Sequence, residues 1–272
     1  MKPAVVLDKN FLQGSPVSVV RALAESHTLV MPGALFFELL TTDIDARRKC
    51  FSKLPQSINP VDLVDHMGVL LKHEGRNNAP CGKPSTHRMS IDFQFNARLV
   101  EEDYTLPAEA QATIDSQIHD ANADVERLIG LSESVPSLFP VLASPRATKS
   151  SPPHREAEAL ISNAQAVKEF YETLDAPDVS HTYPRISGAP EDWAHIRHLQ
   201  VLMLFAVDIH VRYGGKIRSL LSPNVLLKLE HDVHDAQILA LAILEGAIAT
   251  NEKKLVRWFK LLTPGGAVHG DA

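Results

Sequence analysis

Short apolar runs alternate with amphipathic segments over residues 1–42, and this alternation constrains the fold of the chain more than any other feature. Residues 4–7 (AVVL) and 28–32 (TLVMP) each predict a short buried strand. Between them, residues 15–26 begin with Ser-Pro, which is typical of a helix start, and carry their apolar side chains on one face. Residues 33–42 predict a second helix. This order indicates a parallel sheet covered by helices.

The same pattern returns near the end of the chain. One helix is predicted over residues 222–229, and a second begins at Asp232 or Val233 and ends at Glu245. Residues 247–250 (AIAT) then predict a short strand, and a closing helix follows until Thr-Pro-Gly-Gly stops it. The two ends of the chain therefore belong to one α/β fold.

The middle of the chain differs from both ends. Helical patterns there are separated by stretches rich in Pro, Ser, Gly and basic residues, such as 75–88 and 144–155, which could hold a nucleic-acid backbone. We expect a single domain over residues 1–272. Its parts would be a core from 1–45 and 215–262, a large, mostly helical insertion over about 46–214, and a flexible tail at 263–272.

Cysteine content, chain start and hydropathy indicate the compartment. Cys50 and Cys81 are too few for a disulfide framework, and the chain opens directly on a predicted core strand, so we expect a cytoplasmic protein. The most apolar later run, residues 201–211, is interrupted by Asp208 and His210, so no membrane partner is expected. The net charge of -6 gives no support to a strongly basic nucleic-acid clamp, but it does not exclude a nuclease whose acidic site is offset by local basic loops.

Acidic residues follow predicted strands or open predicted helices. Asp8 ends the first strand, Glu38 lies in the helix after the second strand, Asp235 opens a helix with Asp232 one turn earlier, and Glu252 follows the late strand. The carboxyl ends of parallel strands share one edge, so these acids should converge there. Because carboxylates repel one another, protons or cations must neutralise the cluster, and hard oxygen ligands select Mg²⁺ or Mn²⁺.

Such a site indicates hydrolysis of phosphodiester bonds. Two ions about 4 Å apart can activate a water and stabilise the leaving oxygen. The predicted catalytic residues are Asp8, Glu38, Asp235 and Asp232, and Glu252 joins them as a metal ligand. Asp232 could instead be only a helix N-cap. No Gly-x-Ser-x-Gly elbow and no Walker-type loop offers a competing site.

The order of VVLDKNFL, MPGALFFELL, HDVHDAQILALA and IATNEKKL resembles a PIN-like nuclease domain, over under half of the chain. The resemblance implies a three-layer α/β/α fold with a short parallel sheet. It also implies metal-binding roles for Asp8, Glu38 and Asp235, a neighbouring Asn10, and a Thr-x-Asp type turn at residues 250–252. Two residues depart from the family pattern. Lys9 replaces a small residue, and Glu252 is longer than Asp, so either Asn251 or Glu252 faces the metal.

We therefore predict a metal-dependent nuclease with nucleic acid as its partner. An RNA endonuclease is the favoured form of this prediction. The candidate substrate contacts are Lys9, Asn10, Lys216, Arg218, His231, His234, Thr250 and Asn251. The alternative is a catalytically inactive PIN-like module whose helical insertion binds a protein partner. A His-Asp phosphohydrolase is disfavoured, because those enzymes are wholly helical and would leave Asp8 and Glu38 unexplained. The oligomeric state stays open.

Overall fold

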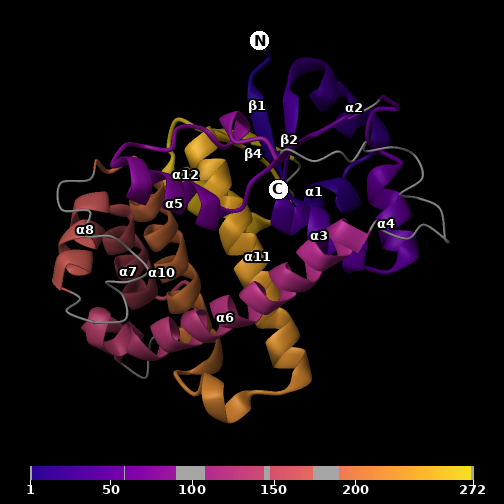
Figure 1. Cartoon of the computed structure of the whole chain (residues 1–272). Helices are drawn as coiled ribbons and strands as arrows, with labels where there is room; N and C mark the ends of the chain where they lie inside the picture. The colour runs from indigo at the N-terminus through magenta and orange to yellow at the C-terminus, as the bar shows by residue number, and fades with distance from the viewer. Residues whose placement is uncertain (1, 58, 90–107, 144–147, 174–189, 271–272) are drawn as a thin grey trace. The chain divides into compact units, whose positions relative to one another are not determined.

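The computed structural model describes residues 2–57, 59–89, 108–143, 148–173 and 190–270 (Figure 1). The chain divides into two compact units, which we describe separately. The sheet unit comprises residues 1–72, 81–114 and 237–272, and the helical unit comprises residues 73–80 and 115–236. Most of the helical unit falls within the insertion that the sequence predicts.

The sheet unit is built on five parallel strands in the order β3-β2-β1-β4-β5. Their bounds are β1 Ala4–Leu7, β2 Thr28–Pro32, β3 Asp62–Val64, β4 Ala247–Ala249 and β5 Ala267–His269. Figure 1 shows β1, β2 and β4 side by side. The central strands are almost wholly buried, as expected for a parallel sheet covered on both faces. The α/β class and the parallel sheet are therefore confirmed.

The two edge strands lie outside the predicted core. Strand β3 falls in a segment that the sequence predicts as helical insertion, and β5 falls in the predicted flexible tail. The prediction of a flexible tail is wrong over residues 267–269, which form a strand paired with β4. The backbone N–H of Ala267 donates to the backbone oxygen of Gly246, and the backbone N–H of Thr250 donates to that of His269. Strand β4 is equally short but wholly buried and apolar, whereas β3 begins with Asp62 and β5 ends with His269, so neither edge strand is a continuous apolar run.

Within the sheet unit, helices alternate with the strands along the chain. They are α1 Lys9–Gly14, α2 Val17–Ser26, α3 Gly33–Thr41, α4 Ile44–Phe51 and α12 Lys253–Leu262. Helix α12 is strongly amphipathic, and it buries Trp258 and Phe259 while Lys253 and Arg257 stay exposed. Helices α5 Met67–Asn77 and α11 Pro223–Glu245 contribute residues to both units.

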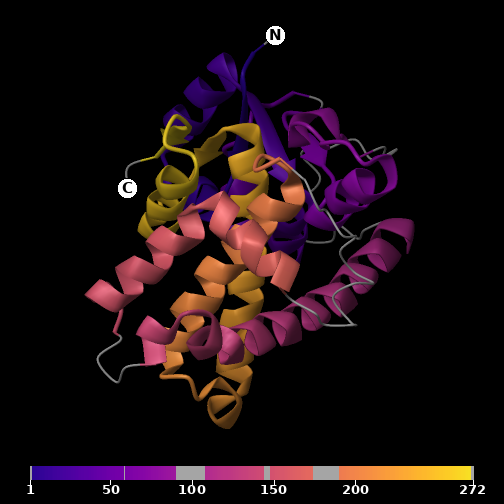
Figure 2. The ribbon, with the colours of Figure 1, turned by 90° about the vertical axis from the view of Figure 1, so that its left-hand side faces the viewer.

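The helical unit is organised around α10 Ala194–Tyr213, twelve of whose residues are buried. Helices α7 Pro152–Ser162 and α8 Ala164–Thr173 pack on it (Figure 2), and α6 Ala108–Leu138 supplies most of its length to the same unit. The buried Glu74 carboxylate accepts hydrogen bonds from the backbone N–H groups of Ala194 and His195, at 2.8 and 3.1 Å. This interaction satisfies the first turn of α10.

One continuous helix replaces the two that the sequence predicts between residues 222 and 245. Ser222 caps α11, accepting from the Val225 N–H at 3.4 Å, and no Gly or Pro interrupts the helix after Pro223. The prediction that Asp232 and Asp235 open a helix is therefore wrong, because both lie inside α11. None of the helices in the described parts of the chain is long and apolar enough to span a membrane.

Candidate acidic site at the carboxyl edge of the sheet

The strand order of the sheet unit reverses between β1 and β4. From this pair, β2 and β3 continue in one direction and β5 in the other. Open parallel sheets bind ligands outside the carboxyl ends of the strands at such a switch point. Asp8 directly follows β1 and Thr250 directly follows β4, and the Asp8 N–H donates to the Ala249 oxygen at 3.0 Å. The first predicted acid therefore lies where a ligand is expected.

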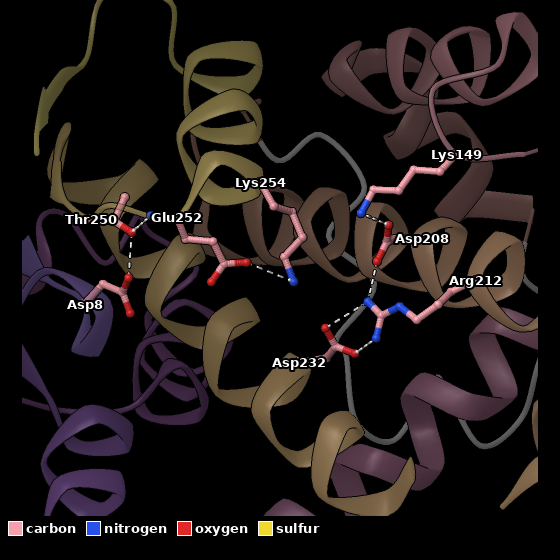
Figure 3. A network of polar contacts seen from close by, with 8 residues as sticks. All are labelled: Asp8, Lys149, Asp208, Arg212, Asp232, Thr250, Glu252 and Lys254. Atoms are coloured by element: carbon pink, nitrogen blue, oxygen red, sulfur yellow. Dashed lines mark hydrogen bonds and ion pairs between the residues drawn. The ribbon is translucent and has the colours of Figure 1, made fainter. Parts of the chain in front are cut away.

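The Asp8 carboxylate organises the turn that follows β4. Its side chain is buried, with 3% of the residue exposed, and its Oδ2 accepts a hydrogen bond from the Thr250 hydroxyl at 2.6 Å (Figure 3). The same hydroxyl accepts from the backbone N–H of Glu252 at 3.0 Å. The Thr250 hydroxyl therefore links the Asp8 carboxylate to the backbone of Glu252.

Burial and neighbouring charges make Asp8 a weaker acid than usual. Burial raises the pKa of Asp8 from 3.8 to about 6, while the hydrogen bond from Thr250 lowers it. The negative charges of Glu252 and Glu38 also contribute to this rise in the pKa of Asp8. Three of the predicted acids are therefore close enough to interact electrostatically within the sheet unit.

Two lysines already balance the flanking carboxylates. Lys9 Nζ lies 3.1 Å from Glu38 Oε1 and donates to the Thr42 hydroxyl at 3.5 Å. Lys254 Nζ lies 3.5 Å from Glu252 Oε1 (Figure 3). The sequence pattern indicates Lys9 as a substrate contact and gives Lys254 no role at all. Only the proximity of Lys254 to Glu252 along the chain could have indicated the second pair.

Asn251 has a structural position beside this site. Its Nδ2 donates to the Ser15 hydroxyl at 3.1 Å and to the Asn10 backbone oxygen at 3.5 Å. Gly270 packs so closely on the same turn that an added Cβ would collide with the backbone oxygen of Thr250. These contacts fasten the turn after β4 to the end of α1 on one side and to β5 on the other.

Asp232 belongs to the helical unit, where both of its carboxylate oxygens accept from Arg212, at 2.7 and 3.2 Å. Arg212 also pairs with the buried Asp208, and Lys149 lies 3.6 Å from Asp208 (Figure 3). Burial alone would lower the pKa of Arg212, but the two carboxylates raise it above its ordinary value. Asp232 therefore takes part in a clamp between α10 and α11.

The other predicted contacts of the helical unit lie along α11 and the segment before it. Asp235 and His234 are half-buried, and His231 is exposed. Lys216 is exposed, whereas Arg218 pairs with Glu126 and Glu133 of α6 at 3.2 and 3.0 Å. The structure thus places Glu38 and Glu252 each within electrostatic range of Asp8 in the sheet unit, and it gives Asp232 and Asp235 to the helical unit.

The basic stretches that could hold a nucleic-acid backbone are partly committed to ion pairs. In the first stretch, Arg88 pairs with Asp62 at 2.9 Å and Lys83 lies 3.8 Å from the buried Glu245. Glu245 also accepts from the N–H and hydroxyl of Ser85, at 2.9 and 3.1 Å. In the second stretch, residues 144–147 lie outside the described part of the chain. Residues 83–88 are therefore attached to the rest of the sheet unit by ion pairs and by the hydrogen bonds of Ser85.

The donor chemistry of the site suits Mg²⁺ or Mn²⁺, since Asp8, Glu38 and Glu252 all offer carboxylate oxygens. Their arrangement is less favourable. Within the described ranges, no three His, Cys, Asp or Glu side chains are grouped so that they could hold a metal ion. Each of the two glutamates pairs instead with a lysine ammonium group.

The chain matches no model of a known protein family, no curated protein and no solved structure. The PIN-like resemblance of the sequence therefore stays a prediction. The structure itself defines an α/β protein whose five parallel strands carry an acidic, lysine-balanced edge at the β1–β4 switch point.

Proposed function

We propose that this protein is a metal-dependent nuclease and that Asp8, Glu38 and Glu252 form the core of its acidic site. The observation that carries the proposal is the position of Asp8. It is a buried carboxylate at the switch point of a parallel sheet, and two further acids raise its pKa. A carboxylate with a perturbed pKa in such a place is typical of functional sites.

The residues of the chain have separate roles in this proposal. A bound Mg²⁺ or Mn²⁺ ion would neutralise the carboxylates and activate water for attack on a phosphodiester. Thr250 orients the Asp8 carboxylate through its hydrogen bond, and Asn251 fixes the turn on which Glu252 lies. Above about pH 6 Asp8 is ionised and ready to accept a cation.

The further acids and the substrate are proposed on narrower grounds. Asp232 and Asp235 are assigned to the site by the sequence pattern alone, and both oxygens of Asp232 accept hydrogen bonds from Arg212. RNA as the substrate rests on the sequence resemblance alone. Among the proposed substrate contacts of the sheet unit, Asn10 is the one whose side chain is exposed.

A cleavage assay with a matched control tests the proposal. The full chain is incubated with labelled single-stranded RNA, structured RNA and DNA, in Mn²⁺, Mg²⁺ or chelator. Asp8→Asn should lose metal-dependent cleavage. Asp45→Asn makes the same chemical change at an exposed position on α4 and should keep it. Full cleavage by Asp8→Asn would refute the assignment.

A second candidate function is a binding module without catalysis. The lysine pairs favour it, because they balance Glu38 and Glu252 without a metal ion. The helical unit offers a partner surface around Leu220, Leu221, Leu226 and Leu227, whose exposed fractions run from 37 to 51%. In that case the chain would neither bind Mn²⁺ nor cleave any substrate, and polar substitutions at these leucines would abolish partner binding.

A further inference from the structure

The connection between α10 and α11 carries a group of exposed apolar side chains in the helical unit. Four of its leucines have exposed fractions between 37 and 51%: Leu220, Leu221, Leu226 and Leu227. The first two lie at the end of the 3₁₀ helix η4 Ile217–Leu220, and the other two lie on the first turns of α11. Figures 1 and 2 both show this connection, in orange, at one end of the helical unit. We call residues 220–227 the leucine tip.

We propose that the leucine tip is the contact surface of a homodimer, in which a second copy of this chain covers it. Homodimerisation goes beyond the proposed nuclease function and does not depend on it. Single exposed leucines are ordinary on protein surfaces, but four within eight residues form a patch that is typical of an interaction site. Two further features favour a second copy as the occupant: the tip is held in place, and the charges around it balance.

The leucine tip is fixed by contacts at its base. Ile217 is buried, and the next residue, Arg218, pairs with Glu126 and Glu133 of α6 at 3.2 and 3.0 Å. Ser222 caps α11 between the two pairs of leucines. A surface that is already held in one conformation loses less conformational entropy when it binds a partner. The four leucines are therefore prepared for a contact with another molecule.

The charged side chains around the leucine tip balance one another. Within residues 216–231 and the two glutamates that Arg218 contacts, three side chains are basic and three are acidic: Lys216, Arg218, Lys228, Glu126, Glu133 and Glu230. An anionic membrane or a strongly charged protein would therefore gain little from electrostatic attraction. A second copy brings the same leucines and the same balanced charges. A two-fold contact between copies buries the leucines at its centre and leaves charges of both signs at its rim.

The size of the leucine tip indicates a reversible dimer. Four leucines supply less apolar surface than an obligate dimer buries, since such interfaces cover about 1,000 Å² or more on each partner. We therefore expect a dissociation constant on the order of 10 µM. Because apolar contacts dominate and the rim carries no net charge, added salt should not dissociate the dimer.

Sedimentation equilibrium of the full chain tests the homodimer. The unchanged chain should shift from monomer to dimer between about 1 and about 100 µM, at low and at high NaCl concentration alike. Leu227→Glu places a charge at the most exposed leucine of the tip and should raise the Kd of the dimer at least about 30-fold. Leu160→Glu makes the same change on α7, where the leucine is 48% exposed, and should leave the Kd unchanged.

Hydrogen exchange identifies the surface that the dimer covers. Amide exchange over residues 219–228 should slow as the protein concentration rises, and this slowing should be absent in Leu227→Glu. Leu220→Glu repeats the test on η4, and circular dichroism checks that each variant folds.

Three results would overturn the homodimer. The first is a chain that stays monomeric over the whole concentration range, and the second is a dimer that neither Leu227→Glu nor Leu220→Glu weakens. The third is a monomer that binds vesicles of equal parts phosphatidylcholine and phosphatidylserine, since the leucine tip would then contact a membrane surface. None of these measurements involves cleavage, so the homodimer and the proposed nuclease function can fail independently.

Discussion

Replacing Asp8 by Asn should stabilise the fold at neutral pH while it removes activity. The pKa of Asp8 is raised from 3.8 to about 6, chiefly by burial. Each unit of pKa difference corresponds to about 1.4 kcal/mol, so ionising Asp8 in the folded chain costs about 3 kcal/mol. Asn resembles the protonated carboxyl group and avoids this cost.

The sign and the pH window follow from proton linkage. Because the folded chain binds the Asp8 proton more tightly than the unfolded chain, its stabilising contribution is complete below about pH 3.8 and is lost as pH rises through about 6. The stability gained by Asp8→Asn should therefore grow from about 0.5 kcal/mol at pH 4 to about 3 kcal/mol at pH 8.

Urea denaturation followed by a tryptophan of the sheet unit can measure this difference. The chain has two tryptophans, with Trp258 in the sheet unit and Trp193 in the helical unit, so a Trp193→Phe background makes Trp258 the only tryptophan reporter. The free energy of unfolding is then compared, from pH 4 to pH 8, between this background and the same chain carrying Asp8→Asn. Titrating groups that do not interact with Asp8 cancel in the comparison. A stability difference that does not grow with pH would refute the reasoning.

Three further changes test the construction of the site and of the helical unit. Gly270→Ala should destabilise the fold by about 2 kcal/mol or more, because the added Cβ collides with the turn after β4; Gly265→Ala, which has open space, is its control in thermal unfolding. Thr250→Val removes a hydrogen bond that lowers the pKa of Asp8, so the acidic limb of the pH–activity profile should move to higher pH, and an unmoved limb would contradict this role. Arg212→Met leaves two buried carboxylates without their shared partner and should cost about 3–5 kcal/mol in urea denaturation; a loss below about 1 kcal/mol would contradict the clamp.

The sequence predicts the central strands well because their signal is local. Strands β1, β2 and β4 are apolar runs of three to five residues bounded by helix starts, and burial in a covered sheet requires that composition. Strands β3 and β5 lie at the edges and are three residues long. Their pairing depends on neighbouring strands that are distant in sequence, and no short window reveals it.

The acids illustrate the same division between local and long-range information. Asp8 is predictable, since it directly follows a buried strand. The ion pair between Lys9 and Glu38 joins residues 29 positions apart, and the pair between Arg212 and Asp232 joins residues 20 positions apart. Sequence spacing gives the positions of such charges on their own elements but not which charge each one meets. That is why Asp232 resembles a metal ligand in the sequence and is an arginine partner in the structure.

The balance of charges at the acidic edge bears on both candidate functions, the metal-dependent nuclease and the binding module without a metal. Asp8, Glu38 and Glu252 carry three negative charges when ionised, and Lys9 and Lys254 supply two positive charges. The remaining charge falls on Asp8, which is the residue whose burial raises its pKa to about 6. Below that pH a proton completes the balance, and above it the site lacks one positive charge. In a binding module this deficit would only destabilise the fold. Under the proposed metal-dependent function, a bound cation would supply the missing positive charge beside Asp8 and offset the cost of ionising it.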